Sequence, residues 1–367
     1  MTSKYDFVVV GAGLFGCAFA RTVRDAGGSV LVVDRRSHVA GNAYDCEVEG
    51  IRHHVYGPHI FHTNDRRLWD WMSRFCSLRH IHHTVKVNFN GKLYSFPINL
   101  LTLSQLWNVH DPVEASRKLQ SVRVLDVDPE SNAKNRILYH AGEEIYRVFF
   151  EGYTAKQWGV DPEHLPASIV ARIPIRLNFN DSYYNDRYVG MPEEGYAAAC
   201  ERMLDGCQVE LGVDFISARE DLSRLGRVVY SGSLDELCGF SLGRLPYRGM
   251  RFENRKQLES DAQGCSVINY TSRHVPFVRA VEYKHLHPCD VSHSSVVYEF
   301  PEPAEKRGEP FYPINNDANA SMHDAYEKMV MEMMPRCVIG GRMGSYRYYD
   351  MHQAIAMGIS KARAAMS

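Results

Sequence analysis

The sequence lacks the features that mark several large classes of protein. It has no excess of basic residues, since 42 Lys and Arg stand against 44 Asp and Glu, which argues against a general nucleic-acid-binding protein. No run approaches the roughly 18 apolar residues that a transmembrane helix needs. No signal-peptide pattern precedes the first strand-like run. We therefore expect a cytoplasmic protein with neither nucleic-acid nor membrane partners.

The cysteines show no pairing pattern. They number nine, are dispersed along the chain and form no CxxC pair, so we expect neither a disulfide framework nor a metal site. Hydrophobic residues make up 45% and charged residues 23% of the chain, which is near the globular average and excludes extensive disorder. With 367 residues and no internal repeat, the chain is long enough for two or three domains.

The N-terminal segment has the pattern of a βαβ unit. The apolar run 5–10 is followed by the glycine turn 11–16, a helical pattern over 17–26 and a second apolar run at 29–33. A parallel sheet is the expected result. The chain ends in a similar way, with a strand, the pair Gly340-Gly341 and a long helix. We expect the two ends to meet in one Rossmann-like domain.

The middle of the chain has a different pattern. Asn90-Gly91 lies between two alternating runs, which predicts a β-hairpin because both residues tolerate positive φ. From 101 to 169 the pattern is helical, and Asp111-Pro112 marks one helix start. Beyond Gly195 four runs predict strands: 207–211, 227–230, 266–270 and 295–298. The last two are expected in an antiparallel sheet, so the fold class is α/β.

A dinucleotide-binding motif lies in the N-terminal unit. Gly11-Ala12-Gly13-Leu14-Phe15-Gly16 follows a strand and opens a helix, and the next strand ends in Asp34. In such a unit the glycines allow a tight turn and the close approach of pyrophosphate, and the acidic residue binds a ribose hydroxyl. Gly41-Asn42 and the distant Gly340-Gly341-Arg342 favour FAD over NAD, because a chain often returns to cover a flavin.

Taken together, these segments resemble the UDP-galactopyranose mutase family. The resemblance runs from near residue 5 to near the C-terminus, and its motifs occur in the family's order. They are 10–16, 41–44, 56–64 (Tyr-Gly-Pro-His-Ile-Phe-His-Thr-Asn), 152–159 (Gly-Tyr-Thr-Ala-Lys-Gln-Trp-Gly), 172–176, 186–188, 311–315, 340–342 and 346–353.

The resemblance implies three interleaved domains with the substrate cleft between them. The Rossmann-like FAD domain would hold an inserted helical bundle and an antiparallel β-sheet domain. The implied bounds are residues 1–77, 192–240 and 329–367 for the FAD domain, 101–182 for the helical domain with its mobile substrate loop, and 78–100, 183–191 and 241–328 for the sheet domain.

The resemblance also implies an intramolecular transferase. Such an enzyme interconverts the pyranose and furanose forms of a nucleotide-diphosphate sugar, here UDP-galactose or a close analogue, for cell-surface polysaccharides. Its FAD must be reduced by an external reductant such as NAD(P)H, and flavin N5 forms an adduct with the sugar, although no net redox change occurs. A homodimer is implied as well.

Carried over residue by residue, the family pattern implies the substrate site. Arg172 and Arg279 would bind the diphosphate, as a planar guanidinium suits phosphate, and Arg176 and Arg248 are lesser candidates. Phe149 and Tyr153, four residues apart on an expected helix, would stack on the base. The other aromatic positions are Trp158 on the mobile loop and Tyr183, Tyr312 and Tyr348 at the diphosphate.

Histidines and glycines complete the expected site. His62 would pack and hydrogen-bond at the isoalloxazine, or alternatively shuttle a proton. His83 stands where galactose enzymes of this family tend to carry Asn beside the sugar, so it is either a determinant of another sugar or a loop residue that points away. The expected cofactor-binding residues are Gly11, Gly13, Phe15, Gly16, Asp34, Arg35, Gly41, Asn42, His59, Gly341, Arg342, Asp350 and Met351.

Two rival functions remain open at this point. The first is a flavin oxidoreductase of the amine-oxidase type, which shares the FAD fold but lacks a diphosphate site. The second is a non-enzymatic nucleotide-binding or redox-sensing protein that keeps FAD and lacks the arginine and aromatic set. Within the mutase reading, the substrate could also be UDP-N-acetylgalactosamine or a deoxythymidine-linked 6-deoxy sugar.

Overall fold

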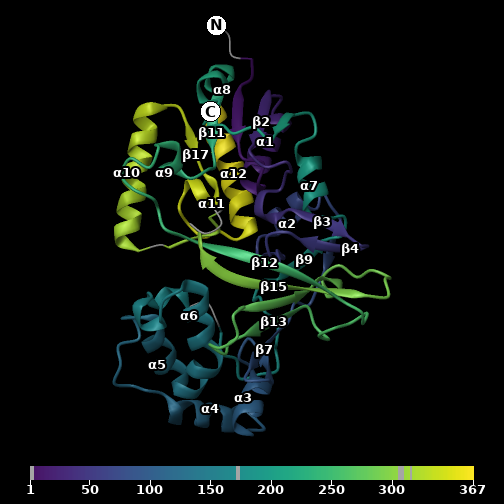
Figure 1. Cartoon of the computed structure of the whole chain (residues 1–367), viewed down its shortest axis with the longest axis vertical. Coiled ribbons are helices and arrows are strands. Elements are labelled where there is room, and N and C mark those ends of the chain that lie inside the picture. Colours follow the sequence, from purple (N-terminus) through teal and green to yellow (C-terminus); the bar gives the residue numbers. More distant parts are fainter. Residues whose placement is uncertain (1–3, 171–173, 305–309, 315) are drawn as a thin grey trace.

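The computed structural model describes residues 4–170, 174–304, 310–314 and 316–367. A parallel sheet with its helices lies at one end of the long axis, a group of helices lies at the other end, and a long antiparallel sheet runs between them (Figure 1). This arrangement confirms the predicted α/β fold class.

Five strands form the parallel sheet, in the order β10-β2-β1-β11-β17. In β1 every residue is buried, and its Val9 lies beside Val32 of β2 and Val229 of β11. Such continuous apolar runs are typical of parallel strands covered on both faces. The bounds are β1 Phe7–Val10, β2 Val30–Asp34, β10 Gln208–Leu211, β11 Arg227–Tyr230 and β17 Val338–Ile339. The predicted βαβ unit and the meeting of the two chain ends are both confirmed.

Helices from both ends of the chain pack against each other beside this sheet. Helix α1 (Leu14–Asp25) begins inside the glycine motif, three residues earlier than the sequence pattern predicted, with Gly13 as its N-cap. Helix α12 (Met351–Met366) lies so close to α1 that a Cβ on Gly358 would be 2.5 Å from the Phe15 carbonyl oxygen. The other helices here are α2 Arg66–Met72, α7 Gly195–Met203, α8 Arg219–Leu225, α9 Leu234–Leu237, α10 Asp317–Met333 and α11 Gly341–Gly344.

The second large sheet has seven strands, in the order β16-β12-β15-β14-β13-β7-β8. The hairpin around Asn90-Gly91 joins β7 to β8 as predicted, and β13 pairs with β7 in parallel, unlike the other strand pairs of this sheet in the described part of the chain. The bounds are β7 Val85–Phe89, β8 Lys92–Phe96, β12 Tyr247–Gln257, β13 Val267–Tyr270, β14 Arg279–Glu282, β15 Ser294–Pro303 and β16 Tyr312–Pro313.

Two small sheets lie between these layers. Strands β3 (Asp45–Val48) and β4 (Ile51–His54) form an antiparallel pair. Strand β9 (Tyr188–Pro192) pairs with β5 (Phe61–Thr63) on one side and β6 (Leu78–His80) on the other. The three-stranded sheet therefore joins segments that are far apart in the sequence, and it brings the loop before β9 next to β5.

The helical group comes from one continuous stretch of the chain. Asp111 caps α4, because its carboxylate accepts the backbone N–H groups of Val113 and Glu114 at 2.7 and 2.9 Å. Helix α5 breaks at Gly142, where φ is +81°, and continues through a π-helical turn over Tyr146–Glu151 into α6. The bounds are α3 Leu100–Trp107, α4 Pro112–Val122, α5 Ala133–Ile145 and α6 Gly152–Trp158.

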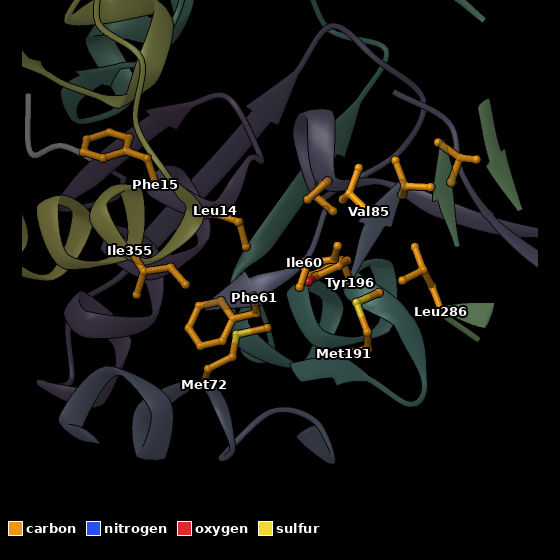
Figure 2. Packing of buried hydrophobic residues seen from close by; sticks show 14 of the residues in the cluster. Leu14, Phe15, Ile60, Phe61, Met72, Val85, Met191, Tyr196, Leu286 and Ile355 are labelled. Carbon is orange, nitrogen blue, oxygen red and sulfur yellow. The ribbon is translucent and has the colours of Figure 1, made fainter. Parts of the chain in front are cut away.

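The largest hydrophobic core runs through all of these layers. Figure 2 shows part of it, where Phe61 and Met72 lie next to each other near Ile355 of α12. All nine cysteines are free. Among the described residues, no helix is long and apolar enough to cross a membrane.

Candidate active site

A cavity opens at the carboxyl ends of β1, β2 and β11, where open α/β sheets bind nucleotides. Asp350, which the sequence also assigned to the cofactor, lies outside its lining and caps α12 instead. The lining includes the other predicted cofactor residues: Gly11, Gly13, Phe15, Gly16, Asp34, Arg35, Gly41, Asn42, His59, Gly341, Arg342 and Met351.

Several lining residues were missed by the sequence reasoning. They follow β10 or β11, or precede α12, and include Val213, Phe215, Ser231, Gly232, Glu236 and Tyr349. One signal was present in the sequence. Parallel strands end at the same edge of a sheet, so residues after the predicted strand 227–230 should face the same cavity as Gly11.

The glycine motif has the geometry that a dinucleotide needs. Gly11 has φ +104°, which only glycine adopts easily, and a Cβ on Gly16 would overlap the Gly11 carbonyl oxygen. The α1 N-cap, Gly13, makes no side-chain capping bond. The first backbone N–H groups of a 12-residue helix are thus available for an anion at the cavity wall. This cradle fits a pyrophosphate.

Asp34 joins this cradle to the end of β2. Its carboxylate is buried and accepts the backbone N–H groups of Ala12 at 2.7 Å and of Arg36 at 2.9 Å. Each carboxylate oxygen has two lone pairs, so these bonds leave acceptor capacity for a ribose hydroxyl. Asp34 therefore has two tasks, because it also holds the glycine turn in place.

A second group of predicted residues surrounds Arg279 on β14. The guanidinium donates to the Tyr153 hydroxyl on α6 at 3.1 Å and lies 3.6 Å from the Glu299 carboxylate on β15. Burial raises the pKa of Glu299 and the charge of Arg279 opposes that rise. The Nε of Arg279 and one oxygen of Glu299 are buried and make no hydrogen bond. This leaves donor and acceptor capacity beside the cofactor cavity.

Tyr312 and Tyr348 extend this group toward the cofactor. Their rings stack with centroids 5.9 Å apart, and the Arg342 guanidinium lies 4.7 Å from the Tyr348 ring centroid. Arg342 also lines the cofactor cavity. The pKa of His59 is lowered to about 4, mainly by burial and also by the charges of Arg342 and Arg279, which keeps this ring neutral.

Phe149 and Tyr153 separate into different parts of the core. Phe149 is buried and its ring lies 5.5 Å from Tyr94, whereas Tyr153 packs in a small cluster with Val278 and Phe311. The backbone between them passes from a π-helical turn into α6, so the four-residue spacing does not act as it would in a regular α-helix. Trp158 is the last residue of α6.

Two of the arginine candidates donate hydrogen bonds to backbone carbonyl groups. Arg248 is buried and donates to the carbonyls of Gln157 and Lys156 at the end of α6. Arg176 donates to the Asn180 and Ser182 carbonyls and so shapes the loop before β9. Arg172 lies outside the described residues.

His83 is buried near the predicted substrate residues. Its ring lies 5.5 Å from that of Tyr183 and 5.8 Å from that of Tyr184, and its Nδ1 makes no hydrogen bond. Burial lowers the pKa of His83 to about 3, helped by the charge of Arg279. His83 therefore does not point into solvent. It lines a second cavity together with Ile81, His80, His82, Ser182, Tyr184, Asp186, Arg187 and Val189.

His62 lies on β5, beside the N-terminus of α12. Its Nδ1 is bonded to the Asp186 carboxylate, and its Nε2 lies 3.9 Å from the Asp350 carboxylate. His62, Asp350 and His352 offer ligand atoms within 4.8 Å of one another. The Asp350 backbone N–H donates to Gln353 Oε1 at 2.9 Å at the start of α12, and we assign these residues no metal.

Comparisons with known proteins agree with this geometry. A family model described as UDP-galactopyranose mutase matches residues 148–348, and one described as an NAD(P)-binding Rossmann-like domain matches residues 9–75. A probable UDP-galactopyranose mutase from Klebsiella pneumoniae is 35% identical over 97% of this chain and 94% of its own. A dTDP-fucopyranose mutase from Escherichia coli is 32% identical over 97% of each chain.

Two further matches bear on fold and on the rival function. The crystal structure of a reduced UDP-galactopyranose mutase covers 99% of this chain and 95% of its own, with a TM-score of 0.75 and 14% identity, which shows a shared fold. A flavin-containing amine oxidase B from Sus scrofa is 32% identical, but over only 30% of this chain and 24% of its own.

The fold and the cavity define a protein of the dinucleotide-binding α/β class, with a cationic and aromatic group beside the cofactor cavity. Matches that span nearly the whole chain specify this class further. The chain belongs to the UDP-galactopyranose mutase family.

Proposed function

We propose that this protein interconverts the pyranose and furanose forms of a nucleotide-diphosphate sugar, UDP-galactose or a close analogue, with reduced FAD. The observation that carries the proposal is the group of Arg279, Tyr153, Tyr312 and Tyr348 next to the lining residue Arg342. Such a group suits a diphosphate leaving group, because charge builds on the phosphate oxygens as the glycosidic bond breaks. Relatives over nearly the full length are named as sugar mutases.

FAD is the proposed cofactor because the cradle at α1 fits a pyrophosphate, Asp34 retains acceptor capacity for a ribose, and a flavin-containing relative matches part of the chain. When bound and reduced, FAD would supply a nucleophilic nitrogen, N5, for chemistry at the anomeric carbon of the sugar. A nicotinamide such as NAD(P)H is the proposed external reductant. Purified protein should be yellow and release FAD on denaturation.

The chain's own residues bind and orient the substrate. Arg279, with Arg172, holds the diphosphate, and the tyrosine hydroxyls of Tyr183, Tyr312 and Tyr348 add hydrogen bonds to it. Phe149 and Tyr153 remain the proposed contacts of the base, although each packs in a different part of the core, and Trp158 closes over the sugar from the end of α6. Arg248 donates to two carbonyls at the end of α6. It therefore positions Trp158 and does not bind the diphosphate itself.

A second candidate substrate is a sugar other than galactose. The two relatives named above, a galactose and a fucose enzyme, are similarly distant from this chain at 35% and 32% identity. His83 is buried beside Tyr183 and lines a cavity that offers room for a sugar substituent. Histidine and asparagine present different donors, so His83 would change the contacts with sugar hydroxyls or an N-acetyl group.

A competition assay separates these candidates. UDP-galactose, UDP-N-acetylgalactosamine and a deoxythymidine-linked 6-deoxy sugar compete for wild type and for His83→Asn. A specificity role for His83 predicts that the variant shifts its preference toward UDP-galactose. If UDP-galactose is best in both proteins by the same ratio, His83 takes no part in specificity. Sedimentation analysis of the same samples tests the proposed homodimer.

Product analysis tests the proposed function against the rival oxidoreductase. Reduced protein incubated with UDP-galactofuranose should form UDP-galactopyranose. An amine-oxidase-like enzyme would instead reduce its flavin with an amine substrate and leave nucleotide sugars unchanged. The amine oxidase match covers less than a third of the chain, which favours the mutase.

A further inference from the structure

Asp186 and His62 form a bonded pair that has no part in the proposed function given above. His62 is on β5, and Asp186 is in the loop before β9, where the two strands pair and place His62 opposite Val189. The Asp186 carboxylate is bonded to His62 Nδ1 through one oxygen and to Asn64 Nδ2 through the other. Asn64 in turn accepts the Arg187 backbone N–H at 2.9 Å. Asp186 is thus held from both sides.

The packing around His62 fixes its ring plane. Tyr184 stacks on the ring with centroids 3.9 Å apart and 17° between the planes, and His352 meets it edge-on at 5.4 Å. His62 is only 9% exposed. With Nδ1 bonded to Asp186, its Nε2 faces Asp350, the N-cap of α12. Met351, the next residue, lines the cofactor cavity.

The chemistry of the pair determines where the imidazole proton lies. An ionised carboxylate can only accept hydrogen bonds, so His62 Nδ1 must be the donor. In a neutral imidazole the other nitrogen then has no proton and acts as an acceptor. Without Asp186 the ring could adopt either tautomer, and its Nε2 would be a donor in one of them.

We propose that Asp186 is a positioning residue that holds His62 in its Nδ1–H tautomer and so directs Nε2 toward Asp350 at the start of α12. Asn64 is the second link, since it orients the Asp186 carboxylate. The inference rests on the proposed function for the effect on catalysis, because that function requires FAD and the family resemblance implies that His62 lies at its isoalloxazine. The tautomer itself depends only on the geometry of this chain.

The test combines spectroscopy with kinetics on the FAD-loaded protein. In Asp186→Asn the amide can donate to Nδ1 and favour the opposite tautomer. Nitrogen chemical shifts of labelled histidine separate protonated from unprotonated ring nitrogens, and His62→Gln assigns the signal. We expect Nδ1–H in wild type, Nε2–H in the variant, and a fall in kcat of about 100-fold with KM changed by less than about threefold.

The matched control is Asp181→Asn. Asp181 lies in the same loop as Asp186, and its carboxylate is bonded to Nε2 of the exposed His82 at 2.8 Å. This variant should leave the His62 signal and kcat unchanged. Asn64→Ala is the second variant if Asp186→Asn does not fold, and it should give a mixture of tautomers. An unchanged His62 tautomer in the folded variants, or Nε2–H in wild type, would overturn the proposal. A wild type with Nδ1–H but no isomerisation would instead overturn the proposed function.

Discussion

The Arg279 guanidinium donates to the Tyr153 hydroxyl at 3.1 Å, although the two residues are 126 positions apart in the sequence. Arg279 comes from the seven-stranded sheet and Tyr153 from α6 of the helical group. The contact therefore ties the two parts of the molecule together at the predicted substrate site. It also keeps the guanidinium fixed, while the buried Nε of Arg279 makes no hydrogen bond.

Removing this guanidinium should impair turnover. Arg279→Ala should lower kcat/KM by about 100-fold, more through kcat than through KM, because the contact strengthens as the diphosphate leaves. Steady-state kinetics with a saturating reductant measure the effect. Arg255→Ala on β12 of the same sheet is the control, since Arg255 is exposed and pairs with Glu253. Equal losses in both variants would remove Arg279 from the substrate site.

Replacing Asp34 should weaken cofactor binding. Asp34→Ala should cost roughly 1 kcal/mol or more of FAD affinity, because it loses a charge-assisted hydrogen bond to the ribose and two backbone partners that hold the glycine turn. Asp34→Asn keeps an acceptor and should lose less. Fluorescence titration of the apoprotein with FAD gives both values. Affinity equal to wild type in Asp34→Ala would place the ribose elsewhere.

Lys156 should be a stabilising residue. Its ammonium faces the carbonyls of Tyr270, Ser272, Val275 and Phe277, at 2.8 to 3.0 Å, and so joins α6 to the β13–β14 connection. Lys156→Met should lower the free energy of unfolding by about 2 kcal/mol, because it leaves these carbonyl oxygens without a hydrogen-bond donor. Urea denaturation measures the change.

Lys92→Met provides the comparison for that measurement, because Lys92 is exposed and donates to a single carbonyl. It should cost well under 1 kcal/mol. Similar losses in the two variants would show that the four carbonyls around Lys156 find other partners.

His83 should make folding stability depend on pH. Its pKa is about 3 in the folded protein against an ordinary value of 6.5, mainly because it is buried. Between these two values the unfolded chain binds more protons, so stability is full above pH 6.5 and falls as the pH drops toward 3. From pH 7 to pH 5 wild type should lose about 2 kcal/mol more than His83→Gln. If wild type and His83→Gln lose the same free energy of unfolding between pH 7 and pH 5, the prediction is wrong and His83 is in contact with water.

The sequence was most informative where structure depends on local patterns. The strand, glycine turn and helix around Gly11 follow from nearby residues, as do the Asn90-Gly91 hairpin and the Asp111 cap. Pairing between distant strands has no local signal. The parallel neighbours β13 and β7, and the three-stranded sheet around β9, therefore appeared only in the structure.

The same limit applies to the site. The glycines and Asp34 were predicted because their spacing reflects one local unit, whereas Arg279 was proposed from the family resemblance alone. No pattern near residue 186 indicates its bond with His62, since the two are 124 positions apart. Asp350 is the N-cap residue of α12, and its assignment to the cofactor stays a prediction, because a capping Asp and a ligand-binding Asp look alike in a sequence.

The measurement that tests the central claim most directly follows product and reductant together. Dithionite-reduced protein is incubated with UDP-galactofuranose without oxygen, and the sugars and the flavin spectrum are recorded over many turnovers. The account predicts many molecules of UDP-galactopyranose per flavin, a flavin that stays reduced, and no turnover by the oxidised protein. Full activity of the oxidised protein, or consumption of one reductant per product, would contradict it.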